Sequence, residues 1–560
     1  MDIKHITTLV TALFAACMQC LAQPSAVKDA AKSVFKLTTY KADGTVLAET
    51  NGILADGEGT AISALKPFLG AARATVTDSR GRQSEVIRML GANELYNMAK
   101  FKVGETKMKP LHFAAAPLKQ GGVAWIVSLV NGKTDITEAK IRSVETFMDK
   151  YAYYILDADV ADGNQEQSIL ISPDGEALAL TKRATATAAM HATDANFATS
   201  LTTNGFALSD PVLSQIGIPP SLPDKQDQAL LVLIMAGQSP DSVKRRAVAA
   251  DFIAKYPTLA DGYTSLARMQ AAEGQYEEAA GTMQEAIKQT EKKDEAHAAY
   301  GKMIYDVAVY ADTTVYAPWT LDLAAKETAE AYAANPLPTY RHQQAQITFA
   351  KGRYQEAYDE FTALLGTSIR NPELFYEASR CKAMMNAPQS EIIALLDSAI
   401  NTTDTLRLRE AAPYFLARAE AYEADSSYRQ AVFDYTRYEI LSATRPGADF
   451  YYVRARAEIK ARLYQQALAD MAAAITLAPG QPTYYAEMAS LQLRVNLADD
   501  ALKTASRCVE IAPDYPEGYL LLGLAQIAKD DKPGGLANLK KADELGNTQA
   551  KQFIEKYSNQ

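Results

Sequence analysis

Apolar and polar positions follow two different patterns along the chain. Within residues 24–215 they alternate in short runs, as in 33–37 (SVFKL) and 74–77 (ATVT), which is typical of half-buried β-strands. Asp-Gly pairs, which favour tight turns, separate these runs at Asp43-Gly44, Asp56-Gly57 and Asp174-Gly175. From about residue 224, Ala, Gln, Glu, Lys and Tyr recur at helical spacing instead. The patterns predict an N-terminal all-β barrel or sandwich followed by an all-α region.

The helical region repeats with a fixed period. Ala467, Ala501 and Gly535 are 34 residues apart, and so are Pro479 and Pro513. Small residues let the two helices of a hairpin approach closely, and proline ends the second helix. The period resembles that of tetratricopeptide repeats (TPRs), helix–turn–helix units that stack into a solenoid with a concave binding surface.

This resemblance implies about nine helical hairpins between residues 224 and 547, with a closing helix in 548–560 whose outer face is polar. A short Pro-rich stretch, 216–223, is expected to link the two regions. The units that depart most from the repeat pattern are 224–257, 294–335 and 371–404.

In this family the first helix of each unit lines the concave face, and that rule selects candidate binding residues. They are His342, Gln346, Phe349, Tyr452, Arg456, Lys460, Leu493 and Arg494. The alternative for the charged members is an ordinary solvated helix face. The Lys/Asn pattern with which some members of the family clamp a C-terminal carboxylate is not evident, so we do not predict binding of chaperone tails.

The order of segments in residues 24–215 resembles that of trypsin-like serine proteases of the bacterial envelope type. The segments that carry the resemblance are 51–57 (NGILADG), 61–71 (AISALKPFLGA), 97–103 (NMAKFKV), 162–170 (DGNQEQSIL) and 196–198 (NFA). The resemblance implies a two-barrel β fold.

The same alignment gives the catalytic positions of that family, and all three are changed. Lys66 takes the place of the histidine, Asn97 that of the aspartate and Gln165 that of the serine. The mechanism needs a hydroxyl nucleophile, an imidazole base and a carboxylate to orient it. An amide is not a nucleophile at neutral pH, and a lysine is protonated unless strongly desolvated. Glu166 also brings negative charge to the oxyanion position. We therefore expect a degenerate domain without catalysis.

An alternative keeps an activity through a relocated catalytic group. Ser168 lies three residues beyond the serine position, and His112 and His191 are the histidines of this region. A serine-type protease or peptidase could pair Ser168 with one of them and use the repeats to recruit substrate. A purely structural role for these residues is the competing interpretation.

The N-terminus has the features of an export signal. Lys4 and His5 precede an apolar run, 6–16, which is too short to span a bilayer, and cleavage is expected after Ala22. The alternative is lipoprotein processing at Cys17, because residues 13–17 (LFAAC) resemble a lipobox. Either route predicts a periplasmic or surface protein of a Gram-negative envelope, and no later segment is apolar enough to cross a membrane.

The composition limits the classes of partner and cofactor that we expect. The net charge of −10 argues against nucleic acid and anionic lipid. The remaining cysteines, Cys381 and Cys508, are expected to be buried thiols, and no Cys/His cluster or phosphate-binding loop implies a metal or cofactor. The sequence thus predicts an exported, non-enzymatic scaffold that binds an envelope protein or peptide. A structural role in assembling a surface or secretion complex is a further alternative.

Overall fold

A computed structural model describes residues 23–158, 167–183, 190–311 and 316–558 of the chain. The predicted export signal, including Cys17, lies outside these residues. The chain divides into two compact units, Met1–Lys292 and Lys293–Gln560, and each is described by itself.

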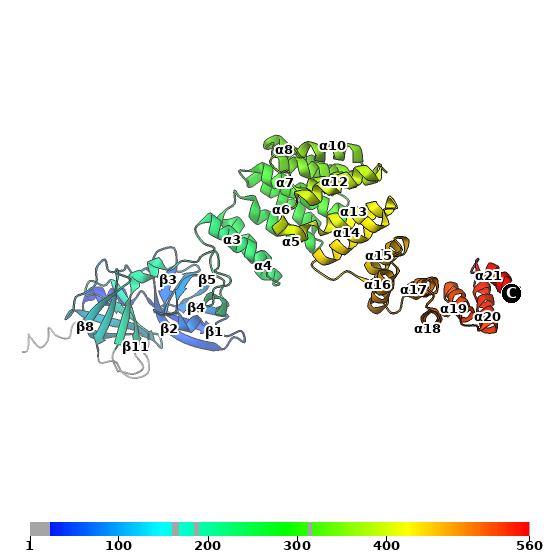
Figure 1. The fold of residues 1–560 in the computed structure, drawn as a ribbon. Helices are drawn as coiled ribbons and strands as arrows, with labels where there is room; N and C mark the ends of the chain where they lie inside the picture. Colours follow the sequence, from blue (N-terminus) through cyan, green and yellow to red (C-terminus); the bar gives the residue numbers. More distant parts are fainter. Residues whose placement is uncertain (1–22, 159–166, 184–189, 312–315, 559–560) are drawn as a thin grey trace, which may run out of the picture. The chain divides into compact units, whose positions relative to one another are not determined.

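Two closed, antiparallel barrels of six strands form the N-terminal part of the first unit (Figure 1). The first barrel has the order β1-β2-β3-β6-β5-β4, with strands β1 (Val34–Tyr40), β2 (Val46–Leu54), β3 (Thr60–Ser63), β4 (Arg73–Thr77), β5 (Gln83–Asn93) and β6 (Met98–Val103). The second has the order β10-β11-β12-β9-β8-β7, with strands β7 (Val123–Val130), β8 (Lys133–Phe147), β9 (Tyr151–Asp157), β10 (Ile169–Ile171), β11 (Ala177–Arg183) and β12 (Met190–Asp194).

Alternating side chains fill the barrels, as the sequence pattern requires. In the first barrel the Phe101 ring lies 5.0 Å from that of Phe68 and 6.4 Å from that of Phe35, measured between centroids. A further apolar cluster spans both barrels, since Ile53 of the first packs in it with Val127 of the second. The barrels are therefore joined by core contacts, and a cleft between them has fixed walls.

Short helices complete the first unit. They are α2 (Ser25–Ala31), η1 (Lys66–Phe68), η2 (Ala195–Ser200), η3 (Leu213–Gln215), α3 (Gln226–Gly237), α4 (Ser242–Lys255), α5 (Ala260–Ala272) and α6 (Tyr276–Gln289). The Pro-rich stretch before α3 packs against β5, because Met89 N donates to Pro219 O at 2.9 Å and Ser221 N donates to Met89 O at 2.7 Å. Arg88 of β5 also bonds both carboxylate oxygens of Asp251 on α4, at 2.7 and 2.8 Å.

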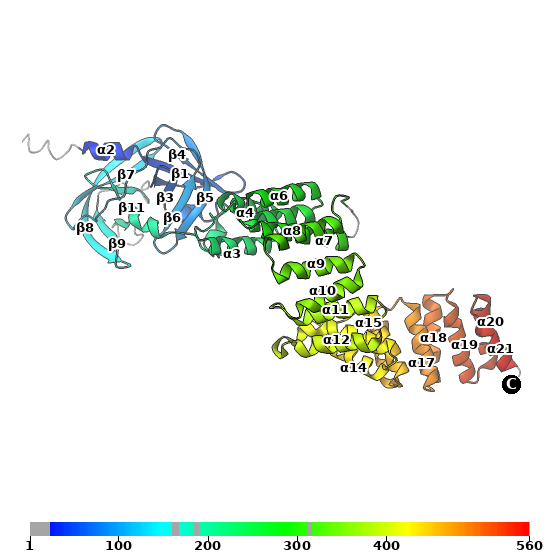
Figure 2. The same ribbon diagram turned by 90° about the horizontal axis from the view of Figure 1, so that it is seen from above.

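The second unit is all-helical, and its helices follow one another as antiparallel pairs (Figure 2). They are α7 (Lys293–Tyr310), α8 (Leu321–Ala334), α9 (Pro338–Ala350), α10 (Tyr354–Leu364), α11 (Pro372–Met384), α12 (Gln389–Thr402), η4 (Thr405–Ala411), α13 (Ala412–Ala424), α14 (Tyr428–Leu441), α15 (Ala448–Lys460), α16 (Tyr464–Leu477), α17 (Pro482–Arg494), α18 (Ala498–Ile511), α19 (Pro516–Ala528), α20 (Lys532–Glu544) and α21 (Ala550–Ser558). The predicted fold class, an N-terminal two-barrel β domain followed by an all-α solenoid, is confirmed.

The small residues of the 34-residue period lie between helices. Ala467 and Ala501 are fully buried. A Cβ at Gly535 would lie 2.7 Å from the carbonyl oxygen of Gly523 on the neighbouring helix, so only glycine fits there. Cys381 and Cys508 are buried free thiols, as expected. Within the described part of the chain, no helix combines the length and the apolar composition that crossing a membrane requires.

Candidate functional site

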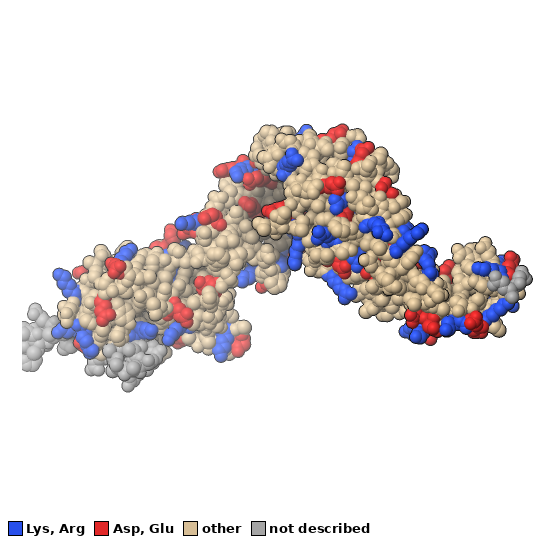
Figure 3. Space-filling view, in the orientation of Figure 1, with Lys and Arg blue, Asp and Glu red and all other residues tan. Residues whose placement is uncertain are grey.

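The first candidate site is a cleft of about 430 Å³ between the two barrels. Polar side chains on its wall include Lys36, Glu49, Asn51, Lys66, Asn131 and Gln167. Lys36 and Glu49 form an ion pair of 2.7 Å across β1 and β2. Lys and Arg are interspersed with Asp and Glu on the face of the barrels drawn in Figure 3, so this surface is not dominated by one sign of charge.

Two of the three positions that the sequence alignment assigned to a catalytic triad, Lys66 and Asn97, are joined by a hydrogen bond, and Lys66 lines the cleft. The backbone N–H of Lys66, the first residue of η1, donates to Oδ1 of Asn97 at 2.9 Å. Asn97 is 6% exposed and has a φ of +51°, and its carbonyl accepts a bond from Leu65 N at 3.2 Å. The Asn97 side chain therefore holds the turn that presents the exposed Lys66 side chain. The third position, Gln165, and its neighbour Glu166 lie outside the described residues.

The segment that follows Gln165 is hydrogen-bonded to β2 of the first barrel. The hydroxyl of Thr50 donates to Oε1 of Gln167 at 3.0 Å, and the amide of Asn51 donates to the Gln167 carbonyl at 3.2 Å. Oδ1 of Asn51 accepts from Leu129 N of β7 at 2.8 Å. The Asn51 side chain thus joins the two barrels, and its polar atoms have the hydrogen-bond partners that a buried polar group requires.

The structure shows no hydrogen bond between the alternative catalytic residues. Ser168 is 1% exposed, and its backbone N–H donates to Oγ1 of Thr181 at 2.8 Å. Within the residues that the structure describes, its Oγ has no hydrogen-bond partner. The ring of His191 packs 5.6 Å from that of Tyr153, while His112 accepts from Ala177 N through its backbone carbonyl. Neither histidine is therefore hydrogen-bonded to the Ser168 hydroxyl.

On the helical array, three predicted binding residues are engaged in contacts within the fold. His342 Nε2 and Gln346 Nε2, both on α9, lie 2.5 and 2.7 Å from the carboxylate oxygens of Glu377 on α11. The Phe349 ring packs 5.3 Å from that of Tyr354 and under the guanidinium of Arg380 at 4.8 Å.

The other predicted residues are distributed over α15 and α17. The ring of Tyr452 lies 5.1 Å from that of Tyr484 and 5.8 Å from the guanidinium of Arg456. Leu493 packs against an apolar cluster at the end of α17, and Arg494 is exposed. Lys460 Nζ lies 3.0 Å from Oε1 of Glu423 on α13.

A second candidate site is a pocket of about 660 Å³ formed by α13, α14 and α15. Its wall includes Leu416, Glu420, Glu423, Phe450, Val453 and Lys460. Of the eight predicted binding residues, Lys460 alone lines it. Glu420 and Glu423 were missed by the sequence reasoning, although counting from the first residue of each helix places them where α9 has Gln346 and Phe349. This equivalence of helix positions is the sequence signal that identifies Glu420 and Glu423.

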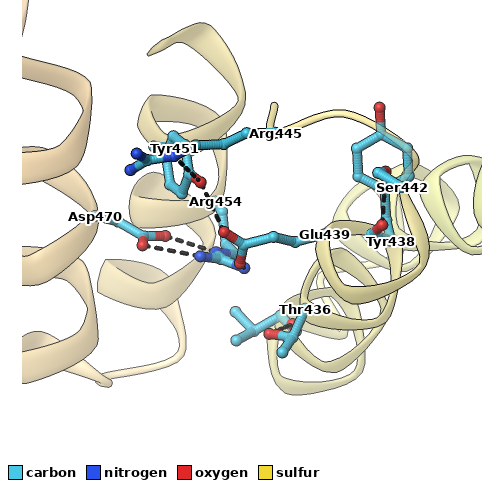
Figure 4. Close-up of polar contacts among 9 residues, drawn as sticks. Thr436, Tyr438, Glu439, Ser442, Arg445, Tyr451, Arg454 and Asp470 are labelled. Carbon is cyan, nitrogen blue, oxygen red and sulfur yellow. Dashed lines mark hydrogen bonds and ion pairs between the residues drawn. The ribbon is translucent and has the colours of Figure 1, made fainter. Parts of the chain in front are cut away.

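Buried ion pairs join the helices next to the pocket. The guanidinium of Arg454 on α15 bonds Asp470 of α16 at 2.6 and 2.9 Å and Glu439 of α14 at 2.7 Å (Figure 4). The hydroxyl of Tyr451 donates to the same Glu439 at 2.7 Å. Because Arg454 is 7% exposed, these contacts are largely desolvated and fix the positions of three consecutive helices.

Comparisons with solved structures find similarity to bacterial proteases. The active form of the Rv3671c protease from M. tuberculosis is 20% identical, with 32% of this chain and 86% of that chain aligned and a TM-score of 0.28. The serine endoprotease from Yersinia pestis is 18% identical over 34% of this chain and 65% of that chain, again with a TM-score of 0.28. The HtrA-type protease AlgW with a tripeptide is 17% identical over 31% and 60%, with a TM-score of 0.28.

No protein-family model matches the chain, and no curated protein matches its sequence. Identities and scores of this size say nothing of the activity of this chain.

Proposed function

We propose that this protein is an exported, non-enzymatic scaffold that binds proteins or peptides of the cell envelope. In this proposal the helical pairs are TPR units and supply the main binding surface. The barrel domain is a degenerate relative of trypsin-like proteases, and its cleft can accept an extended strand through backbone groups alone.

The observation that carries the proposal is the chemistry at the degenerate catalytic positions. A lysine and an asparagine occupy the positions of the base and its orienting acid. Oδ1 of Asn97 accepts from the backbone N–H of Lys66, and this contact supports a structural role for Asn97. The sequence puts an amide, Gln165, in the place of the nucleophile. Without a base and a nucleophile, acyl transfer by the serine-protease route has no starting step.

The test compares cleavage with binding on the full-length protein. Wild type, Ser168→Ala and the exposed control Ser214→Ala are incubated with casein and with fluorogenic peptides. We expect no turnover by any of them. Cleavage by wild type that is lost in Ser168→Ala and kept in Ser214→Ala would establish the protease alternative and end this proposal.

The binding arm starts from intact cells. A tagged full-length protein is cross-linked in place and purified from the envelope fraction, and the bound proteins are quantified. One or two stoichiometric envelope proteins are expected for a scaffold. A broad set of cut fragments would instead indicate substrate handling. Retention of the protein in the membrane fraction by wild type, but not by Cys17→Ala, would identify lipidation rather than soluble export.

A further inference from the structure

The pocket between α13 and α15 combines apolar and acidic side chains. Leu416, Phe450 and Val453 contribute apolar surface, and Val453 is 38% exposed. The carboxylates of Glu420 and Glu423, on the same helix α13 as Leu416, also line the pocket. Such a pocket suits a ligand that is apolar along its length and charged at its tip.

The charges of the pocket do not balance. Three carboxylates, those of Glu420, Glu423 and Asp449, line it with one ammonium group, that of Lys460. Glu423 is already engaged, because its Oε1 lies 3.0 Å from Lys460 Nζ and its Oε2 accepts from the Tyr435 hydroxyl at 3.2 Å. The carboxylate of Asp449 accepts from the hydroxyl of Tyr484.

Glu420 is the carboxylate that remains. In the described part of the chain it has neither a hydrogen bond nor an ion pair, although its side chain is open to solvent. The protein atoms on one side of it partly desolvate the carboxyl group and, together with the charge of Glu423, raise its pKa. A cation placed beside it would relieve both effects.

We propose that this pocket binds a Lys or Arg side chain of an extended peptide, with its alkyl stem against Leu416, Phe450 and Val453 and its charged head at Glu420. The proposal rests on the proposed function, whose partner it narrows to a basic segment of an envelope protein. The complementary charge favours this occupant over an acidic peptide, which would meet an excess of carboxylates.

The experiment uses the full-length protein and an array of immobilised nine-residue peptides. Their central residue is fixed as Lys, Arg, Leu or Glu, and the flanking positions are randomised without charged residues. Wild type, Glu420→Gln and Glu330→Gln are compared. Glu330 is exposed on α8 and outside the pocket, so its variant changes net charge by the same amount. Circular dichroism confirms that each variant is folded.

We expect wild type to prefer central Lys and Arg over Leu and Glu, and Glu420→Gln to lose roughly fivefold to tenfold of its binding to the basic peptides, as for a partly desolvated charge-assisted contact. Glu330→Gln should keep the wild-type preference. Binding without preference for a basic residue, or a preference that Glu420→Gln retains, overturns this inference and leaves the proposed function standing. Absence of peptide binding by wild type at every central residue overturns both.

Discussion

The ionisation of the buried Glu458 side chain links the stability of the helical array to pH. The side chain lies on α15 and is 4% exposed, and its Oε2 has no hydrogen-bond partner among the residues described. Burial is the main cause that raises the pKa of this carboxyl group to about 8, and the charges of Asp470 and Glu439 add to it. Arg454 opposes the rise, but its guanidinium is already bonded to both of those acids.

The sign of the pH effect follows from this raised pKa. Between the ordinary value of 4.5 and about 8, Glu458 holds its proton in the folded chain and loses it in the unfolded chain. The free energy of unfolding therefore falls as pH rises through this window and levels off above it. At about 1.36 kcal/mol for each pKa unit, the full effect is about 5 kcal/mol.

The perturbation is Glu458→Gln, which is neutral at every pH and nearly the same shape. We expect it to match wild type at pH 5 and to be more stable by about 2–5 kcal/mol at pH 9, because the cost of ionising a buried acid is removed. Urea unfolding of the full chain, followed by circular dichroism at a wavelength that reports helices, measures the difference. Glu510→Gln, an exposed control on α18, should behave like wild type. An identical pH dependence of Glu458→Gln and wild type would refute the reasoning.

Two further predictions concern close contacts of the backbone. Gly535→Ala would place a Cβ 2.5 Å from Ile527 Cγ1, so we expect the free energy of unfolding in urea to fall by about 1–3 kcal/mol. Gly480→Ala is the control, because Gly480 has open space around it. Equal unfolding midpoints for the two variants would show that α19 and α20 lie farther apart. Asn97→Ala removes the acceptor for Lys66 N and puts alanine at a φ of +51°, so we expect a loss of about 1–3 kcal/mol in thermal unfolding. Asn97→Asp keeps the acceptor oxygen and should stay close to wild type, and equal losses in both variants would contradict the role of the Asn97 side chain in holding the turn at Lys66.

The fold was predictable because its signals are local. Asp43-Gly44 and Asp174-Gly175 lie at turns where Gly44 and Gly175 have φ of +83° and +84°, a conformation that glycine adopts readily. The small residues Ala467 and Ala501 of the helical period are buried, and Gly535 leaves no room for a Cβ beside Gly523. Other turns carry no such signal. Ser426, Arg462 and Asp530 adopt positive φ between the helices of their hairpins. Because these residues are not glycine, the sequence does not indicate the turn conformation there.

The candidate sites were less predictable because they depend on partners far along the chain. His342 and Gln346 have the residue types and the helix position of binding residues, yet they bond to Glu377, 35 and 31 residues away. Glu420 lacks any local motif, since a single glutamate on a helix is normally solvated. Glu420 is a candidate because it lines a pocket and because the neighbouring Glu423 is already paired with Lys460. Both features exist only in the folded array.

The ion pairs behind the pocket explain why its shape is fixed. Arg418 of α13 bonds Asp434 of its own hairpin and Asp397 of the hairpin before, and Arg454 of α15 does the same with Asp470 and Glu439. Turning one hairpin against the next would break the Arg418–Asp397 or the Arg454–Glu439 ion pair, while each arginine would keep the buried acid of its own hairpin. Because α13 and α15 are the two walls of the pocket, each wall is held by its own arginine. A ligand therefore meets a preformed site, and its binding does not have to include the free energy of ordering the helices.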